Sequence, residues 1–172
     1  MNGTINDCLI LSADDLSVVK WYVDASFGVH PDFQSHTGAV MTMGKGAILS
    51  GSNKQRLNTR SSCEAELVDA DDYATKILWT KLFIEEQGYE IRRNVLYQDN
   101  KSTILLLENG KQSSGKRTRA LNIRYFFLHD QRSKGNVAFD YCPTGEMVGD
   151  VFTKPLQGEQ ARVLRQKVMG IG

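Results

Sequence analysis

The chain is most informative at residues 20–50, which read KWYVDASFGVHPDFQSHTGAVMTMGKGAILS. Residues 20–27 contain the apolar run WYV and predict a buried strand. Residues 36–43 predict a second strand, a tight turn with two glycines follows at 44–46, and residues 47–50 begin a third strand. Because these connections are short, we expect the three strands to form an antiparallel meander.

Beyond the meander the sequence predicts alternating helices and strands. The first helix spans residues 61–87, with a serine N-cap, acids in its first turn and a glycine after its end. The remaining elements are a strand at 95–97, helices at 101–109 and 123–133, a strand at 137–141, a short helix at 144–153 and a final helix at 159–169. Strands joined by long helical crossovers pair in parallel. We therefore expect an α/β fold with a mixed five-stranded sheet, three antiparallel strands followed by two parallel ones, and helices on both faces.

The composition fits one globular domain, with 172 residues, 41% hydrophobic and 24% charged. No apolar run reaches the ~20 residues that a membrane span needs, and the N-terminus lacks the pattern of a secretory signal. The three cysteines, Cys8, Cys63 and Cys142, are an odd number without paired spacing. They argue against a disulfide framework and against a zinc site.

Two acids follow buried apolar runs directly. Asp24 ends the first predicted strand and Asp99 ends the fourth. In α/β sheets such strand ends point into the functional crevice. One acid there is usually a turn or cap residue, but two of them, with a further acid near the start of the first helix, indicate a shared site. Carboxylates are the ligands that Mg²⁺ prefers, and two such ions can support phosphodiester hydrolysis.

A basic stretch lies between two predicted helices. Residues 111–124 carry five cations and no acid, in a chain whose net charge is only +1. Such a stretch can follow a phosphate backbone. Judged by charge alone, a solvated loop is the more frequent explanation.

Five blocks of sequence resemble, in order, those of the ribonuclease H domain in the Pol polyprotein of copia-type (Pseudoviridae-like) LTR retrotransposons. The blocks are YVDAS at 22–26, SSCEAEL at 61–67, YQDNKS at 97–102, NIRYFF at 122–127 and GDVFTKPL at 149–156. The resemblance covers residues 16–158, and five blocks in order make it specific. It implies a ribonuclease H-like fold.

The resemblance also implies a catalytic metal site of the Asp-Glu-Asp-Asp type. Its aspartates map directly onto Asp24, Asp99 and Asp150. Helical periodicity does not choose between Glu64 and Glu66 for the glutamate, because both lie at margins of the apolar stripe. The Ala-Glu-Leu block of ribonucleases H matches Glu66, so we predict Glu66 as the ligand and Glu64 as a helix-start acid. The implied cofactor is a pair of Mg²⁺ ions, with Mn²⁺ as a substitute.

The activity implied is that of a metal-dependent endonuclease that hydrolyses the RNA strand of RNA–DNA hybrids during retrotransposon reverse transcription. The implied partners are the hybrid and the reverse transcriptase domain of the same polyprotein. We expect residues 1–17 to be a linker or lead-in from that domain, 18–158 the ribonuclease H domain, and 159–172 a C-terminal helix and tail. We expect the protein in the cytoplasm, within a virus-like particle, or in the nucleus.

Nucleic-acid contacts are predicted at six residues, namely Ser26, Ser102, Lys111, Lys116, Arg117 and Arg119. For the two serines, local turn bonding is an equally good explanation. Relatives often carry a histidine where this chain has Ala120, so any substrate role of that histidine is absent or moved. The chain's own histidines, His30, His36 and His129, are predicted to be surface or strand residues.

Two other functions are compatible with such a fold. A non-catalytic hybrid-binding or connection domain keeps the fold and loses the acids, whereas all four acids are present here. An integrase or transposase lacks the Ala-Glu-Leu block and the C-terminal GDVFTKP pattern. The nuclease is therefore the function that the sequence favours.

Overall fold

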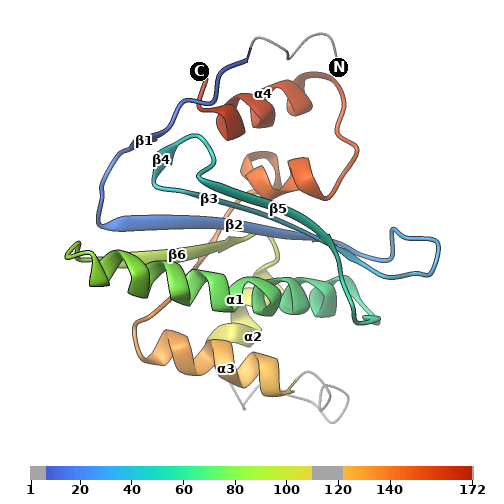
Figure 1. The fold of residues 1–172 in the computed structure, drawn as a ribbon. Helices are drawn as coiled ribbons and strands as arrows, with labels where there is room; N and C mark the ends of the chain where they lie inside the picture. Colours follow the sequence, from blue (N-terminus) through green and yellow to red (C-terminus); the bar gives the residue numbers. More distant parts are fainter. Residues whose placement is uncertain (1–6, 110–121, 172) are drawn as a thin grey trace.

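A mixed five-stranded sheet forms the centre of the molecule (Figure 1), in the order β5-β3-β2-β6-β7. The computed structural model describes residues 7–109 and 122–171. The strands of this sheet are β2 (Val18–Ser26), β3 (His36–Thr42), β5 (Leu49–Lys54), β6 (Arg93–Gln98) and β7 (Ala138–Tyr141). Antiparallel pairing joins β5, β3 and β2, and parallel pairing adds β6 and β7. The predicted fold class is confirmed.

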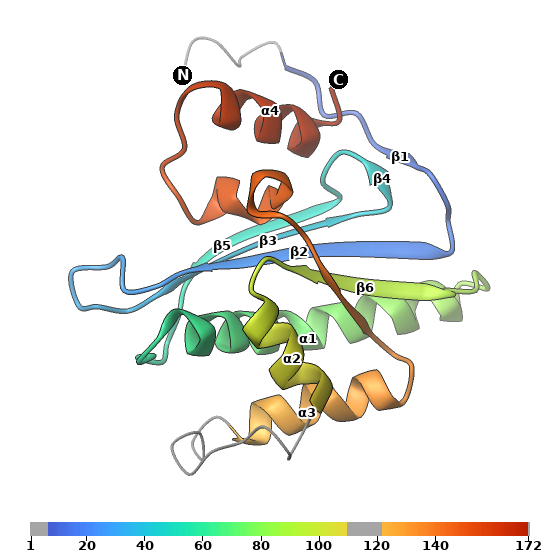
Figure 2. The same cartoon turned by 180° about the vertical axis from the view of Figure 1, so that it is seen from behind.

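Helices cover both faces of the sheet (Figures 1 and 2). On one face lie α1 (Ser62–Glu86), α2 (Lys101–Asn109) and α3 (Asn122–Ser133). On the other lie α4 (Gly158–Met169) and two 3-10 helices, η3 (Thr144–Glu146) and η4 (Val148–Phe152). The short helix predicted at 144–153 is therefore two separate 3-10 turns. Within the described part of the chain, no helix is long and apolar enough to cross a membrane.

The main hydrophobic core lies between the sheet and α1. Val19, Trp21 and Val23 alternate along β2 and are fully buried against the apolar face of α1. The indole Nε1 of Trp21 donates a hydrogen bond to Asn94 Oδ1 on β6, 3.1 Å away, so the ring is buried without an orphaned donor. Each such side chain contributes about 1.5–3 kcal/mol on burial. This packing fixes α1 against β2.

A second, two-stranded sheet was not predicted. β1 (Ser12–Ala13) pairs antiparallel with β4 (Gly44–Lys45), in the stretch where the sequence predicted only a tight turn, and the strand expected from residue 47 begins at Leu49 instead. The backbone N–H of Ile10 also donates to Met169 O at the end of α4. The described part of the predicted lead-in thus contacts both the β4 turn and the C-terminal helix.

Candidate metal centre

Three carboxylates meet at one edge of the sheet. Tyr22 pairs with Tyr97 across the parallel strands β2 and β6, so Asp24 and Asp99 each lie two residues beyond a paired position. Glu66 reaches the same edge from the first turns of α1. One oxygen from each of the three carboxylates lies within 4.8 Å of the others. We call Asp24, Glu66 and Asp99 the three-acid group.

The two glutamates at the start of α1 have different surroundings. Glu66 is 5% exposed and belongs to the three-acid group. Glu64 instead caps the helix: its backbone N–H donates to Ser61 Oγ at 3.2 Å, and its Oε2 accepts from the backbone N–H of Arg60 at 2.7 Å. Periodicity left this choice open; in the structure Glu66 is the glutamate that lies with Asp24 and Asp99.

The three-acid group is electrostatically unbalanced. Burial raises the pKa of Glu66 well above its usual value, and the charges of Asp24 and Asp99 raise it further. Among the described residues, Glu66 Oε2 has no hydrogen-bond partner. Two carboxylates 4 Å apart repel by about 4 kcal/mol at an effective dielectric constant of 20. A buried, unpaired carboxylate oxygen among other carboxylates fits a hard divalent cation.

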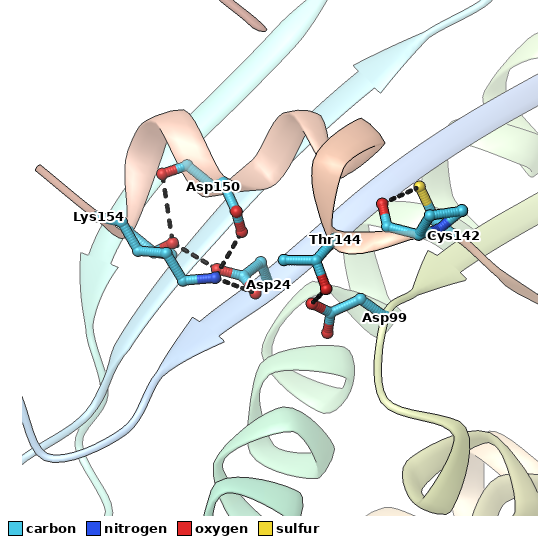
Figure 3. A network of polar contacts seen from close by, with 8 residues as sticks. Asp24, Asp99, Cys142, Thr144, Asp150 and Lys154 are labelled. Carbon is cyan, nitrogen blue, oxygen red and sulfur yellow. Dashed lines mark hydrogen bonds and ion pairs between the residues drawn. The ribbon is translucent and has the colours of Figure 1, made fainter. Parts of the chain in front are cut away.

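The fourth predicted acid, Asp150, lies beside this group without belonging to it. Asp150 is on η4 and is 1% exposed. The ammonium of Lys154 lies between Asp150 and Asp24 (Figure 3), with Nζ 2.7 Å from Asp150 Oδ1 and 3.3 Å from Asp24 Oδ1. Burial raises the pKa of Asp150 to about 6, although the hydrogen bond from Lys154 lowers it. The hydroxyl of Thr153 donates to the second oxygen of Asp24.

Glycine lets η4 approach the sheet closely enough to place Asp150. Gly38 on β3 pairs with Asp24. A Cβ added to Gly38 would lie 2.7 Å from Gly149 O and 2.5 Å from the Cγ2 of Thr153. A larger residue would therefore push η4 away from Asp24. Ser52 on β5 also anchors η4, because its hydroxyl donates to Phe152 O at 2.8 Å.

Asp99 is oriented from the loop after β7. The hydroxyl of Thr144 donates to Asp99 Oδ2 at 2.9 Å (Figure 3). The neighbouring Asn100 caps α2, since its Oδ1 accepts from the backbone N–H of Ser102 at 3.0 Å. Ser102 is exposed at the start of α2, whereas Ser26 is only 7% exposed at the end of β2. Ser102 is therefore the better placed of the two serines to meet a ligand.

The other predicted residues lie away from the three-acid group or outside the described chain. His30 and His36 hydrogen-bond to each other, and His129 Nδ1 lies 3.1 Å from Leu107 O. The predicted basic contacts and the departure from relatives fall outside the described residues, at Lys111, Lys116, Arg117, Arg119 and Ala120.

Sequence reasoning missed a buried acid on α1. Asp69 is fully buried, and neither of its carboxylate oxygens is hydrogen-bonded among the described residues. Burial raises its pKa well above the usual value, and the charges of Glu66 and Asp24 raise it further. The side chain of Thr37 lowers the pKa, but by less. Spacing was the available signal, because Asp69 follows Glu66 by three residues and residues i and i+3 share a helix face. Lys154 was also missed. Its spacing of four residues from Asp150 was a local signal, but nothing local in the sequence indicates Asp24 as its second partner.

The class of fold follows from comparison with solved structures. LC11-RNase H1, isolated from compost, matches with a TM-score of 0.57 and 14% identity over 79% of this chain and 92% of that one. The same enzyme in complex with an RNA/DNA hybrid matches with a TM-score of 0.52 and 12% identity over 75% and 88%. The RNase H domain of PFV matches with a TM-score of 0.54 and 13% identity over 84% and 94%. The chain has the ribonuclease H fold.

The proteins that this chain resembles in sequence are much longer than the chain itself. No family model matches the chain. The chain is 28% identical over 98% of its length to a retrovirus-related Pol polyprotein from transposon TNT 1-94 of Nicotiana tabacum, and 29% identical over 90% to that of transposon RE1 of Arabidopsis thaliana. The Transposon Ty1-JR1 Gag-Pol polyprotein of Saccharomyces cerevisiae is 26% identical over 84%. The chain spans 12%, 10% and 8% of these proteins. It is homologous to a segment of copia-type Pol polyproteins, which confirms the predicted resemblance.

Proposed function

We propose that this chain hydrolyses the RNA strand of RNA–DNA hybrids with the help of divalent cations, as part of retrotransposon reverse transcription. The observation that carries this proposal is the three-acid group, built at the sheet edge of a ribonuclease H fold with Asp150 beside it. One neighbour with the same fold was solved with an RNA/DNA hybrid, which supports a hybrid as the substrate. Discrimination of RNA from DNA would rest on duplex shape and on 2′-hydroxyls.

The donor set of the site supports Mg²⁺, with Mn²⁺ as a substitute. Asp24, Glu66 and Asp99 would hold one ion through carboxylate oxygens alone, and Asp24 with Asp150 would hold a second. Bound in this way, the ions supply an activated water and stabilise the charge on the leaving oxygen. Thr144 and Thr153 hold Asp99 and Asp24 in fixed orientations, so the carboxylates need little rearrangement to act as ligands.

The substrate contacts and the cellular setting are further parts of the proposal. Exposed Ser102 lies close in sequence to Asp99 and would meet the hybrid backbone, as would the basic stretch at residues 111–124. The reverse transcriptase segment of a Pol polyprotein would deliver the hybrid. We propose that the protein works in a cytoplasmic virus-like particle or in the nucleus, with residues 1–17 as the lead-in from the reverse transcriptase.

A cleavage assay with matched duplexes tests the proposal. Labelled RNA is presented as an RNA–DNA hybrid, as a single strand and as double-stranded RNA, and labelled DNA is presented as a duplex, each with Mg²⁺, with Mn²⁺ and with chelator. We expect the RNA strand of the hybrid to be cut only when a divalent cation is present. Cutting in chelator, or equal cutting of duplex DNA, would refute the proposal. Tight hybrid binding without any cleavage would favour the non-catalytic binding domain.

A further inference from the structure

Lys154 joins two buried acids at the candidate metal centre. Its ammonium is paired with Asp24 Oδ1 and Asp150 Oδ1, and both aspartates are 1% exposed while Lys154 is 34% exposed. Among the described residues, the ion pairs of these two aspartates involve Lys154 alone. The lysine therefore offsets one of the two negative charges in this part of the site.

The position of this ammonium follows from the turn that ends η4. The backbone N–H of Lys154 donates to Asp150 O at 3.0 Å, which places the two side chains on the same side of a helical turn. The preceding residue, Thr153, is held by its hydrogen bond to Asp24. Local backbone structure thus directs the lysine side chain across Asp24 (Figure 3).

The four acids consequently form two unequal parts that share Asp24. In the three-acid group, a carboxylate oxygen of Glu66 lacks a partner in the described structure, and an incoming cation would satisfy it. Between Asp24 and Asp150 a cation is already present, because the ammonium contacts an oxygen of each. A divalent cation can join the first part through Glu66 and Asp99 without displacing a bound cation, whereas the second part must first lose a bound charge.

We propose that Lys154 is a built-in counter-ion that competes with the second divalent cation for Asp24 and Asp150. This inference rests on the proposed metal-dependent function and adds the order in which the two ions bind. The first ion binds the three-acid group, and the second binds only as the ammonium moves away. No covalent bond changes in this exchange, in which a charge of +2 replaces a charge of +1.

A lysine is suited to this exchange. Its ammonium is a compact, strongly hydrated charge on a flexible stem, and at 34% exposure the head group can move into solvent. In the free protein the ammonium offsets one of the two negative charges and so weakens the repulsion between the two carboxylates. The protein is then stable without metal, at the cost of weaker binding for the second ion.

Titration calorimetry with Mn²⁺ or Mg²⁺, at constant ionic strength and without nucleic acid, tests the proposal. Lys154→Met keeps the stem and removes the charge. The matched control is Lys134→Met, because Lys134 Nζ lies 2.6 Å from Asp130 in a pair of the same spacing that is exposed on both sides. We expect Lys154→Met to bind the second ion at least about tenfold more tightly than the parent protein. The control should bind like the parent.

Labelling of the parent protein keeps the test decisive if Lys154→Met does not fold. Acetylation of Lys154, followed by mass spectrometry, should rise in step with the second binding event, while acetylation of Lys134 should not change. If ions bind but neither the affinity of Lys154→Met nor the labelling of Lys154 changes, the counter-ion role is wrong and the metal centre stands. If no divalent cation binds the parent or the variant, the proposed metal-dependent function fails as well.

Discussion

The two faces of the sheet hold the acids of the candidate metal centre in different ways. On the α1 face a continuous apolar core fixes the helix that carries Glu66. On the η4 face the buried apolar cluster is smaller: Val40, Ala47 and Val148 are buried, and partly buried Tyr22, Phe152 and Val168 pack against them. A cavity of about 490 Å³ opens beside it. Asp150 is held there by close backbone approach and a few hydrogen bonds. The comparison indicates a rigid three-acid group and a more adjustable fourth acid.

The largest expected effect is on the rigid side, where Glu66→Gln should reduce hybrid cleavage at least about 100-fold. Replacing a residue that only orients metal ligands already lowers metal affinity or activity about 10- to 100-fold. Glu66 lies within the three-acid group itself. Glu64→Gln should cost only a few-fold, because Glu64 caps α1. Single-turnover cleavage rates measure both variants. Equal losses, or a larger loss for Glu64→Gln, would contradict the placement of α1.

The next largest effect is expected for Gly38→Ala, which should displace η4 and with it Asp150. The new Cβ would lie 2.7 Å from Gly149 O, so η4 must shift and take Asp150 and Lys154 with it. We expect a loss of about 1–3 kcal/mol in the free energy of unfolding and about tenfold slower cleavage. The first divalent cation should still bind in calorimetry, since none of the three acids lies on η4, although Asp24 would lose its hydrogen bond from Thr153.

The matched control for this substitution is Gly145→Ala on η3. No described atom lies within 4 Å of a Cβ added at Gly145, so this variant should keep the parent's stability and rate. If Gly38→Ala behaves like Gly145→Ala in urea melts and in cleavage, close approach of η4 is not what positions Asp150.

The rigid face also carries the buried carboxyl of Asp69, whose replacement should stabilise the protein. Its pKa in the folded protein is raised, so the folded state keeps a proton that the unfolded chain loses above about pH 4. The contribution of Asp69 to stability is therefore greatest below pH 4 and falls as the pH rises toward the folded pKa, by up to about 1.4 kcal/mol per pH unit.

Asp69→Asn removes this loss, so the variant should exceed the parent by about 1 kcal/mol or more at neutral pH and by less at pH 4.5. Urea unfolding in chelator at both pH values measures the difference, and the exposed Asp130→Asn serves as the control. If Asp69→Asn is less stable than the parent at both pH values, the carboxylate has a structural partner.

The smallest effect concerns the basic stretch, most of which lies outside the described residues. Replacing Lys116 and Arg117 by alanine should weaken binding of every hybrid sequence and flatten the slope of log affinity against log salt by about one unit per lost contact. Folding and metal binding should not change, because no acid is removed. A parental salt slope would identify the stretch as a solvated loop.

Local signals in the sequence predicted most of the fold and much of the site. The start of α1 was predictable because Ser61 and Glu64 form their capping contacts within a few residues. The pairing of β1 with β4 was not, because strands of two residues leave no periodicity. Leu82 continues the apolar spacing of Ala70, Ala74 and Leu78 along α1 but is 59% exposed, since periodicity marks a helix face without saying what covers it.

The same limit applies to the site. The Asp-Glu-Asp-Asp set came from resemblance, because acids 42, 33 and 51 residues apart share no local pattern. The ion pair of Lys154 with Asp24 depends on η4 crossing the sheet at Gly38, and a contact between such distant segments cannot be predicted from residue spacing.

The most direct test of the central claim is hybrid cleavage by Asp24→Asn. The rate is measured with saturating Mg²⁺, beside the parent protein and the Asp130→Asn control. Asp24 is the one acid shared by the three-acid group and the Lys154 pair. We predict that Asp24→Asn folds with at least the parent's thermal stability in chelator, since a repelling charge is removed, and that it loses cleavage by at least about 100-fold. A well-folded Asp24→Asn that cuts the hybrid at the parental rate would contradict the account.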